Sequence, residues 1–357
     1  MADTIPTPGK TSPTDRAGWP AQPELGPADD EWHDHSPHWW ETETAWFTFN
    51  VPERKVCGSL YVKARAMQEN CDGGAWVWDD SEADALYDVQ PAGLPFPNRG
   101  GSLLDLTAPN GVTIKVLEPL MRYHTTYRDP GKFEADLVHE GIIRPHSHPI
   151  GAWPYWNSRH FDQPMHTTGT IVVAGEEIAV DSYTIRDRSW GPRPEGPTPP
   201  DKKLERGAWT FNERPARAAL PYSVGYMYGA QDARHAFLAG TSPLMTPEGE
   251  LSDDLDPGAG YLVRDGIYAP LVRGYRETEL DPVGTWVRRV HIEGIDALGR
   301  KLDAVGEVVS RWGHHQGGCA FVHWTWDDGC DGWGEDESGA PADWMAALDG
   351  KTFPDLT

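Results

Sequence analysis

Short runs in which apolar and polar residues alternate constrain the fold of this chain more than any other feature. Every second residue from Leu60 to Ala64 is apolar, and residues 111–116, 286–292 and 319–326 repeat the pattern. Strict alternation is typical of β-strands that bury one face. The chain also contains 38 Gly and 32 Pro, too many for a mostly helical protein. The sequence therefore predicts an all-β protein of antiparallel strands, folded as sandwiches or barrels.

A weak internal repeat predicts two such units. The segment around Trp46 is similar to the segment around Trp209, and Ser189-Trp190-Gly191 is echoed by Gly332-Trp333-Gly334. Duplication of one β unit would explain both pairs, whereas chance similarity among 17 Trp residues is the alternative. We expect a disordered tail over residues 1–30, a first β-barrel over 31–195, a second over 196–340 and a C-terminal tail over 341–357.

The charge of the chain excludes several classes of partner. The formal net charge is −24, so nucleic acid and anionic membrane surfaces are disfavoured as partners. No apolar run is long enough to span a bilayer, and the N-terminus lacks the pattern of a secretory signal. We therefore expect a cytoplasmic protein with reduced cysteines and no stable membrane insertion. The sequence leaves the oligomeric state open.

The densest group of chemically capable residues surrounds Asp187. If residues 179–191 form a strand, Tyr183 and Asp187 share one face while Arg186 and Arg188 share the other. In one interpretation, Asp187 forms a salt bridge with a neighbouring arginine and has a structural role. In the other, Asp187 projects into an apolar cavity, where burial raises its pKa and makes it a general acid.

Two histidine groups have spacings seen in metal ligands. These are His33, His35 and His38, and the pair His146 and His148. Neither group has a carboxylate at a familiar interval, so we interpret both as surface loops and expect no metal ion.

His160 is a stronger candidate for catalysis. It precedes a predicted strand that leads into the Asp187 strand, and an antiparallel pairing would bring His160 near Tyr183 and Asp187. A hydrogen-bonded structural histidine is the alternative. His323, between apolar and Trp residues on another predicted strand, is either a core residue or part of a second pocket.

Sequence motifs for other mechanisms are absent. There is no Gly-x-Ser-x-Gly elbow and no glycine-rich phosphate loop. We therefore expect no nucleotide, no dinucleotide and no other cofactor.

The segment from Asp187 to Arg193 resembles the Arg-Asp-His-Ser-Trp-Gly-x-Arg signature of the tandem-lipocalin superfamily, which includes carotenoid 1,2-hydratases and AttH-like proteins. Arg188 stands where the family usually has His. Matches to the same superfamily are Phe161-Asp-Gln163, Gly207-Ala-Trp209 and Gly332-Trp-Gly-Glu335.

This resemblance implies two lipocalin-like antiparallel β-barrels packed together, with an apolar pocket for isoprenoid-like or polycyclic molecules and no cofactor. Asp187 matches the Asp of the hydratase signature, and His160 matches an upstream His. Ile185 stands where the hydratases have Tyr, so Tyr183 is the candidate replacement. Asp162 stands where they have Trp.

We therefore expect a cofactor-independent hydratase or dehydratase, a hydro-lyase, that acts on a terpenoid or similar hydrophobic molecule. Protonation of an alkene needs a neutral acid, and aromatic faces stabilise the resulting cation by roughly 0.5–2 kcal/mol each. Asp187 would be the acid, and His160 and Tyr183 would position water. The predicted substrate-binding residues are Trp190, Trp209, Tyr226, Trp312, His323 and Trp324.

Three alternatives remain at this stage. A lipocalin-like barrel also suits a non-catalytic carrier of a sterol, terpenoid or polyketide. A pericyclase or isomerase would use the same scaffold. Carbohydrate chemistry would need two carboxylates facing each other across a groove, which the sequence does not identify.

Overall fold

Antiparallel strands make up nearly all of the regular structure. The computed structural model describes residues 25–81, 85–148, 159–192, 226–241, 255–280, 287–314, 317–326, 329 and 331–336. These residues contain no α-helix. None of the short helical turns among them is long and apolar enough to cross a membrane. The all-β prediction is confirmed. The helical turns are 3₁₀ helices, namely η1 (Pro27–Asp30), η2 (Pro52–Arg54), η3 (Ala66–Gln68) and η4 (Pro97–Gly100).

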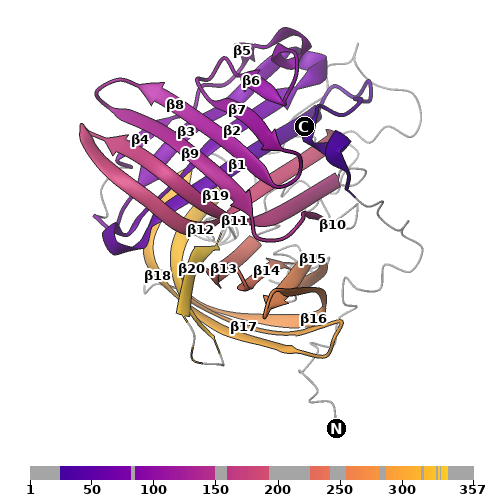
Figure 1. The fold of residues 1–357 in the computed structure, drawn as a ribbon, viewed down its shortest axis with the longest axis vertical. Helices are drawn as coiled ribbons and strands as arrows, with labels where there is room; N and C mark the ends of the chain where they lie inside the picture. The colour runs from indigo at the N-terminus through magenta and orange to yellow at the C-terminus, as the bar shows by residue number, and fades with distance from the viewer. Residues whose placement is uncertain are drawn as a thin grey trace, which may run out of the picture. The chain divides into compact units, whose positions relative to one another are not determined.

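The chain divides into two units (Figure 1). The described part of the first unit lies between residues 25 and 192, and that of the second between 226 and 336. The predicted boundary between residues 195 and 196 and the predicted tail 341–357 lie outside the described residues. Pro27–Asp30, at the end of the segment expected to be a tail, form η1, and Asp30 is fully buried.

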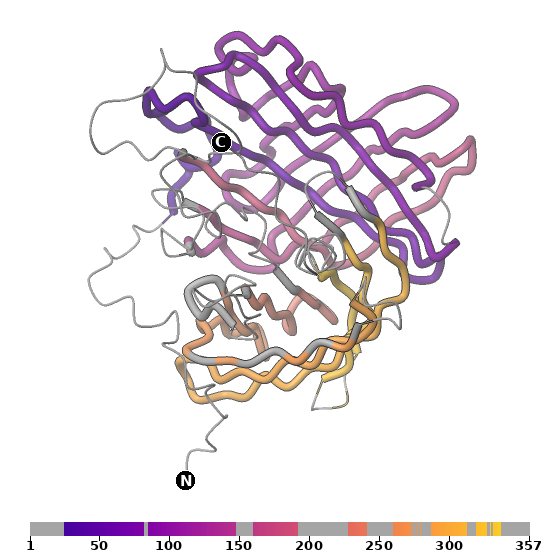
Figure 2. Tube along the Cα trace, turned by 180° about the vertical axis from the view of Figure 1, so that it is seen from behind, coloured from indigo at the N-terminus to yellow at the C-terminus, as the bar shows by residue number. Residues whose placement is uncertain are grey.

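The first unit is one antiparallel sheet of twelve strands (Figure 2). Hydrogen bonds connect its strands in the order β4-β3-β2-β1-β12-β11-β9-β8-β7-β6, with β5 on β3 and β10 on β11. The strands are β1 (Glu41–Val51), β2 (Val56–Arg65), β3 (Asn70–Trp78), β4 (Tyr87–Val89), β5 (Leu94–Pro95), β6 (Asp105–Thr107), β7 (Thr113–Glu118), β8 (Arg122–Asp129), β9 (Phe133–Gly141), β10 (His146–His148), β11 (Arg159–Val173) and β12 (Glu176–Pro192).

Apolar side chains from alternate positions of these strands meet on one face of the sheet, the core face. Phe49 and Phe133 stack there with ring centroids 6.0 Å apart. The hydroxyl groups of Tyr87 in β4 and Tyr127 in β8 lie 2.7 Å apart. Because β4 and β8 are near opposite ends of the strand order, this contact shows that the sheet curls around its core. The opposite surface of the sheet is called the outer face below.

The second unit is a closed eight-stranded antiparallel barrel, the form expected from the lipocalin resemblance. Its first strand, β13, pairs with its last, β20. The strands are β13 (Tyr226–Asp232), β14 (His235–Thr241), β15 (Leu255–Arg264), β16 (Ile267–Leu280), β17 (Val287–Asp296), β18 (Lys301–His314), β19 (Gly317–Trp326) and β20 (Asp331–Asp336).

The repeated Trp-Gly motif occupies equivalent places in the two units. Trp190 lies in β12, which pairs with β1, and Trp333 lies in β20, which pairs with β13. In each unit the last described strand therefore lies beside the first. This relationship gives the second pair of the sequence repeat a structural meaning, whereas Trp209, from the first pair, lies outside the described residues.

Candidate functional site

One histidine and two carboxylates converge on the outer face of the first unit. Asp162 of β11 lies directly opposite Asp187 of β12, so their side chains share a face. His160 lies two residues before Asp162 and projects to the same side, whereas Met165 projects into the core. His160 Nε2 is 2.9 Å from Asp162 Oδ2 and 2.9 Å from Asp187 Oδ2. We call these three residues the His160 cluster.

The side chains of the His160 cluster are largely buried. The side chains of His160, Asp162 and Asp187 are 13%, 3% and 16% exposed. Burial alone would lower the pKa of His160, but the charges and hydrogen bonds of Asp187 and Asp162 outweigh it and raise this pKa well above 6.5. The imidazole therefore holds a proton at neutral pH, between two carboxylates.

Among the described residues, two groups of side chains have the donor atoms that a metal ion needs. The ligand atoms of the His160 cluster lie within 4.8 Å of one another, as do those of His291, Glu293 and Asp303 on β17 and β18. In the second group, every side chain is 29–38% exposed. In the His160 cluster, the imidazolium already supplies a positive charge to both carboxylates. The expectation that this protein needs no metal stays a prediction.

Aromatic side chains continue the line of Asp162 and Asp187 across the outer face. Trp46 of β1 lies directly opposite Asp187, and Tyr61 of β2 lies directly opposite Trp46. The four residues, here called the Asp187 row, come from four adjacent strands and span about 14 Å at the usual strand spacing. Trp76 of β3 completes an aromatic cluster, with its ring centroid 5.8 Å from Trp46 and 6.1 Å from Tyr61.

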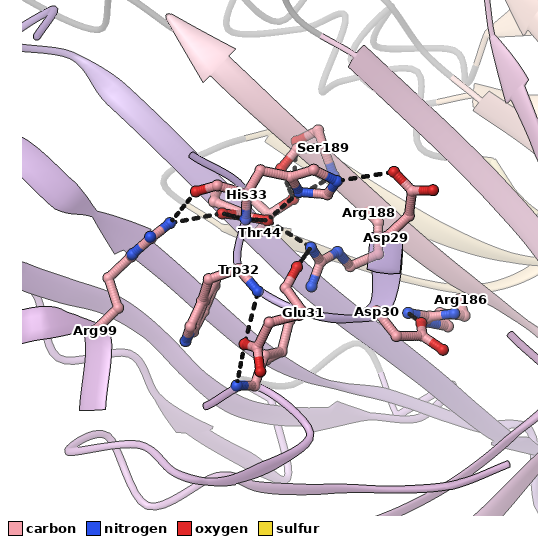
Figure 3. A network of polar contacts seen from close by, with 12 residues as sticks. Asp29, Asp30, Glu31, Trp32, His33, Thr44, Arg99, Arg186, Arg188 and Ser189 are labelled. Carbon is pink, nitrogen blue, oxygen red and sulfur yellow. Dashed lines mark hydrogen bonds and ion pairs between the residues drawn. The ribbon is translucent and has the colours of Figure 1, made fainter. Parts of the chain in front are cut away.

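The two arginines beside Asp187 point the other way, into the core face, where Figure 3 shows Arg186 beside Asp30. Arg186 Nη2 donates to Asp30 Oδ1 at 2.6 Å, and Arg188 Nη2 donates to Glu43 Oε1 at 2.5 Å. All four side chains are at most 5% exposed. The first interpretation of Asp187, a salt bridge to Arg186 or Arg188, is therefore wrong, because successive strand residues face opposite sides. The second interpretation placed Asp187 in an apolar cavity, but its carboxylate contacts His160, which also contacts a second carboxylate, that of Asp162. Arg193, the other arginine in the motif, lies outside the described residues.

The carboxylate of Asp30 has hydrogen-bond partners in addition to Arg186. It also accepts hydrogen bonds from the backbone N–H of Leu120 at 2.5 Å and from the hydroxyl of Tyr123 at 3.0 Å. The same tyrosine hydroxyl accepts a hydrogen bond from Arg186. The segment that contains η1 thus supplies the counter-charge for a buried guanidinium, which is a structural role.

Trp190 lies on the core face and not beside Asp187. Its ring stacks on His33 at a centroid distance of 3.9 Å and packs edge-on against Phe161. His33 in turn contacts Glu43, with 2.7 Å between Nδ1 and Oε1. Trp190, which the sequence predicts to bind substrate, therefore lies on the face opposite Asp187, because the two residues are an odd number of positions apart on one strand.

Tyr183 shares the outer face with Asp187 but lies four residues away, about 13 Å along the strand. Its ring stacks on His166 at 4.9 Å. His166 Nε2 also lies 2.7 Å from Asp181 Oδ1, at an exposed site. The structure brings His160 to Asp187 as the sequence suggested, and it leaves Tyr183 outside hydrogen-bonding distance of both.

The remaining predicted binding residues belong to the second unit or lie outside the described residues. Trp324 is fully buried in the core of the barrel, with its ring edge-on to Phe237 at 5.1 Å. His323 lies 2.9 Å from Asp331 and 4.6 Å from the ring of Trp333. Trp312 is half-buried on β18. The backbone of Tyr226 begins β13, whereas its side chain and all of Trp209 lie outside what the structure describes.

Sequence reasoning missed Asp162, Trp46 and Tyr61 as site residues. The sequence marks Trp46 only as part of a repeat, and Asp162 only as a departure from a family pattern. The His-x-Asp spacing of His160 and Asp162 is a local signal that both face one side of a strand. The position of Trp46 depends on the pairing of β1 with β12, for which the sequence holds no local signal.

Comparisons with known proteins place the chain in a family and identify its fold. Residues 26–206 match a family described as a domain of unknown function, DUF7064. No curated protein matches the sequence significantly.

Several solved structures are similar. A candidate AttH protein of Nitrosomonas europaea is 14% identical with a TM-score of 0.58, covering 89% of this chain and 96% of that one. CghA is 13% identical with a TM-score of 0.52, covering 84% and 87%. Kievitone hydratase of Nectria haematococca is 10% identical with a TM-score of 0.46, covering 83% and 87%. The first two likenesses show the fold, and at the level of the fold the predicted resemblance to AttH-like tandem-lipocalin proteins is confirmed.

Proposed function

The chain belongs to the DUF7064 family, whose function is unknown, and from this premise we propose that the His160 cluster is the proton-transfer site of a hydratase or dehydratase. The observation that carries the proposal is the contact of one imidazole nitrogen with two carboxylate oxygens, each at 2.9 Å. Such a group holds a proton at a defined position, where general acid–base catalysis can use it.

Either direction of the reaction transfers one proton between the cluster and the substrate, adds or removes one water molecule, and returns the cluster to its starting protonation state. In hydration, the proton shared by His160 and Asp187 moves to one alkene carbon, and a cation forms on the other. Water adds to this cation, and the oxygen releases a proton that returns to the pair. In dehydration, the pair protonates the hydroxyl group, water leaves, and the neighbouring carbon returns the proton. Neither direction needs a redox cofactor.

The surroundings of the cluster suit a hydrophobic substrate. Trp46 and Tyr61 continue the Asp187 row, and each aromatic face within about 6 Å of a cation stabilises it by roughly 0.5–2 kcal/mol. The row of about 14 Å is long enough for a terpenoid or a molecule of two to three rings. Asp162, rather than the distant Tyr183, is the second group that orients His160.

A screen with purified protein tests the proposal. The protein is incubated with a panel of terpenols and the corresponding alkenes, and mass spectrometry follows the gain or loss of 18 Da, the mass of water. We expect turnover of at least one compound and a loss of at least about 100-fold in Asp187→Asn. Full turnover in Asp187→Asn would remove Asp187 from the chemistry.

Asp181→Asn is the matched control. Asp181 pairs with His166 on the same two strands, at 2.7 Å, but its side chain is 79% exposed. The proposal expects this variant to retain wild-type turnover. Binding without any mass change would instead favour a carrier, and a product of unchanged mass would favour an isomerase or pericyclase.

A further inference from the structure

We infer that the indole N–H of Trp46 recognises an oxygen atom of the substrate, so that the substrate is an oxygenated, ring-containing hydrophobic molecule. This inference rests on the proposed function, since it places the substrate along the Asp187 row. It names a specificity-determining residue and a substrate class that the His160 cluster alone does not define.

The first line of support is position. Trp46 lies directly opposite Asp187 on the neighbouring strand, so the two side chains leave the outer face side by side. Directly opposite residues of an antiparallel pair have Cβ atoms about 4.5–5.5 Å apart. A molecule protonated by the His160 cluster therefore lies within reach of the indole.

The second line of support is an unused donor. Trp46 Nε1 is buried, and among the residues that the structure describes no acceptor lies within hydrogen-bonding distance of it. A buried N–H without an acceptor has lost its hydrogen bonds to water and gained none in return, which is unfavourable. A carbonyl, hydroxyl or ether oxygen of a ligand would remove that cost.

The third line of support is that Trp46 is not needed to fill the core. It is absent from the apolar cluster of the first unit, which contains its neighbours Ala45 and Phe47. Its ring instead contacts Tyr61 and Trp76, at centroid distances of 5.4 and 5.8 Å. These two rings hold the indole in place before a ligand arrives.

Two probes of nearly equal shape test the inference without any turnover. 2-Acetylnaphthalene carries a carbonyl oxygen, and 2-isopropylnaphthalene has the same carbon skeleton without it. We expect the wild-type protein to bind the ketone about 3- to 10-fold more tightly than the hydrocarbon, as one hydrogen bond allows. Trp46→Phe, which keeps an aromatic ring and removes the N–H, should bind both probes equally. The hydrocarbon should bind this variant as it binds wild type.

Trp326→Phe is the matched control. Trp326 Nε1 is likewise buried without an acceptor among the described residues, but Trp326 lies in the core cluster of the second unit. This variant should keep the wild-type preference for the ketone. In protein labelled with ¹⁵N-tryptophan, the Nε1–H resonance that Trp46→Phe removes should shift with the ketone and not with the hydrocarbon.

The outcomes separate this inference from the proposed function. Failure of wild type to bind either probe, equal binding of both, or a preference that persists in Trp46→Phe overturns the role of Trp46. Asp187→Asn should keep the ketone preference even though the proposed function expects its turnover to fall at least about 100-fold. If no turnover is found, the binding test of Trp46 can still be carried out. If the ketone preference is absent, the proposed proton transfer at the His160 cluster is still tested separately by turnover.

Discussion

Asp187 Oδ2 lies 2.9 Å from His160 Nε2, and the two side chains reach each other from adjacent antiparallel strands. Because Asp162 Oδ2 lies at the same distance from the same nitrogen, two anions stabilise one imidazolium. We predict that His160 titrates well above 6.5, and that Asp162→Asn lowers this pKa while Asp181→Asn does not. Ring ¹⁵N chemical shifts across pH 5 to 9 measure the titration. A titration at or below 6.5 in wild type would contradict the described geometry.

Protonation of His160 makes the stability of the first unit depend on pH. The pKa of His160 is raised in the folded chain, so its contribution to the free energy of unfolding is complete below about 6.5. That contribution is lost as the pH rises through the folded-state pKa. We therefore predict that wild type loses more stability than His160→Gln between neutral and alkaline pH, as measured by urea denaturation. Parallel pH dependence of the two proteins would be the opposite result.

The ion pair of Asp30 and Arg186 provides a test of the core face. Asp30→Asn keeps the size of the side chain but leaves a guanidinium that is 2% exposed without its anion. We predict that it destabilises the fold by about 3–5 kcal/mol in urea denaturation. Glu176→Gln, which breaks an exposed pair with Arg54, should leave the midpoint unchanged. Equal effects of the two variants would mean that burial of the Asp30 pair contributes nothing.

His139 predicts the opposite pH behaviour from His160. It is fully buried, and its ring nitrogens lie 2.9 Å from the hydroxyl of Thr125 and 2.8 Å from that of Thr167. Burial, with a smaller contribution from the charge of Arg186, lowers the pKa of His139 to about 3. The unfolded chain takes up this proton near 6.5, so stability falls as the pH drops from there towards 3. Its ring ¹⁵N shifts should stay constant from pH 7 to 4.5 in the folded protein and titrate near 6.5 in urea.

Removal of divalent metals tests the role of the imidazolium. A metal ion bound by the folded protein alone would raise the melting temperature. We predict that EDTA leaves the melting temperature unchanged, because protonated His160 already pairs with both Asp162 and Asp187. Addition of Zn²⁺ to the EDTA-treated protein should not raise it. A fall with EDTA that Zn²⁺ reverses, and that His160→Gln abolishes, would identify a metal centre instead.

The strands were predictable from sequence because their signal is local. Leu60, Val62 and Ala64 alternate with polar residues and are fully buried in the core, as the pattern predicts. Asp187 and His160 were predictable as a pair because the strands that carry them follow each other in the chain. Trp46 was not, since it meets Asp187 across about 140 residues of sequence. Trp190 illustrates the opposite error. It is close to Asp187 in sequence, which suggested that the two side chains lie together, but they point to opposite faces of one strand.

The burial of Asp30 has a practical consequence for anyone who shortens this chain. An alignment of strands alone would place the start of the fold at Glu41, the first residue of β1. Recombinant protein trimmed to that point would keep every strand of the sheet but would lack Asp30, the one carboxylate that pairs with Arg186 among the described residues. Expression plasmids for this family should therefore begin upstream of Gly26, where η1 is capped.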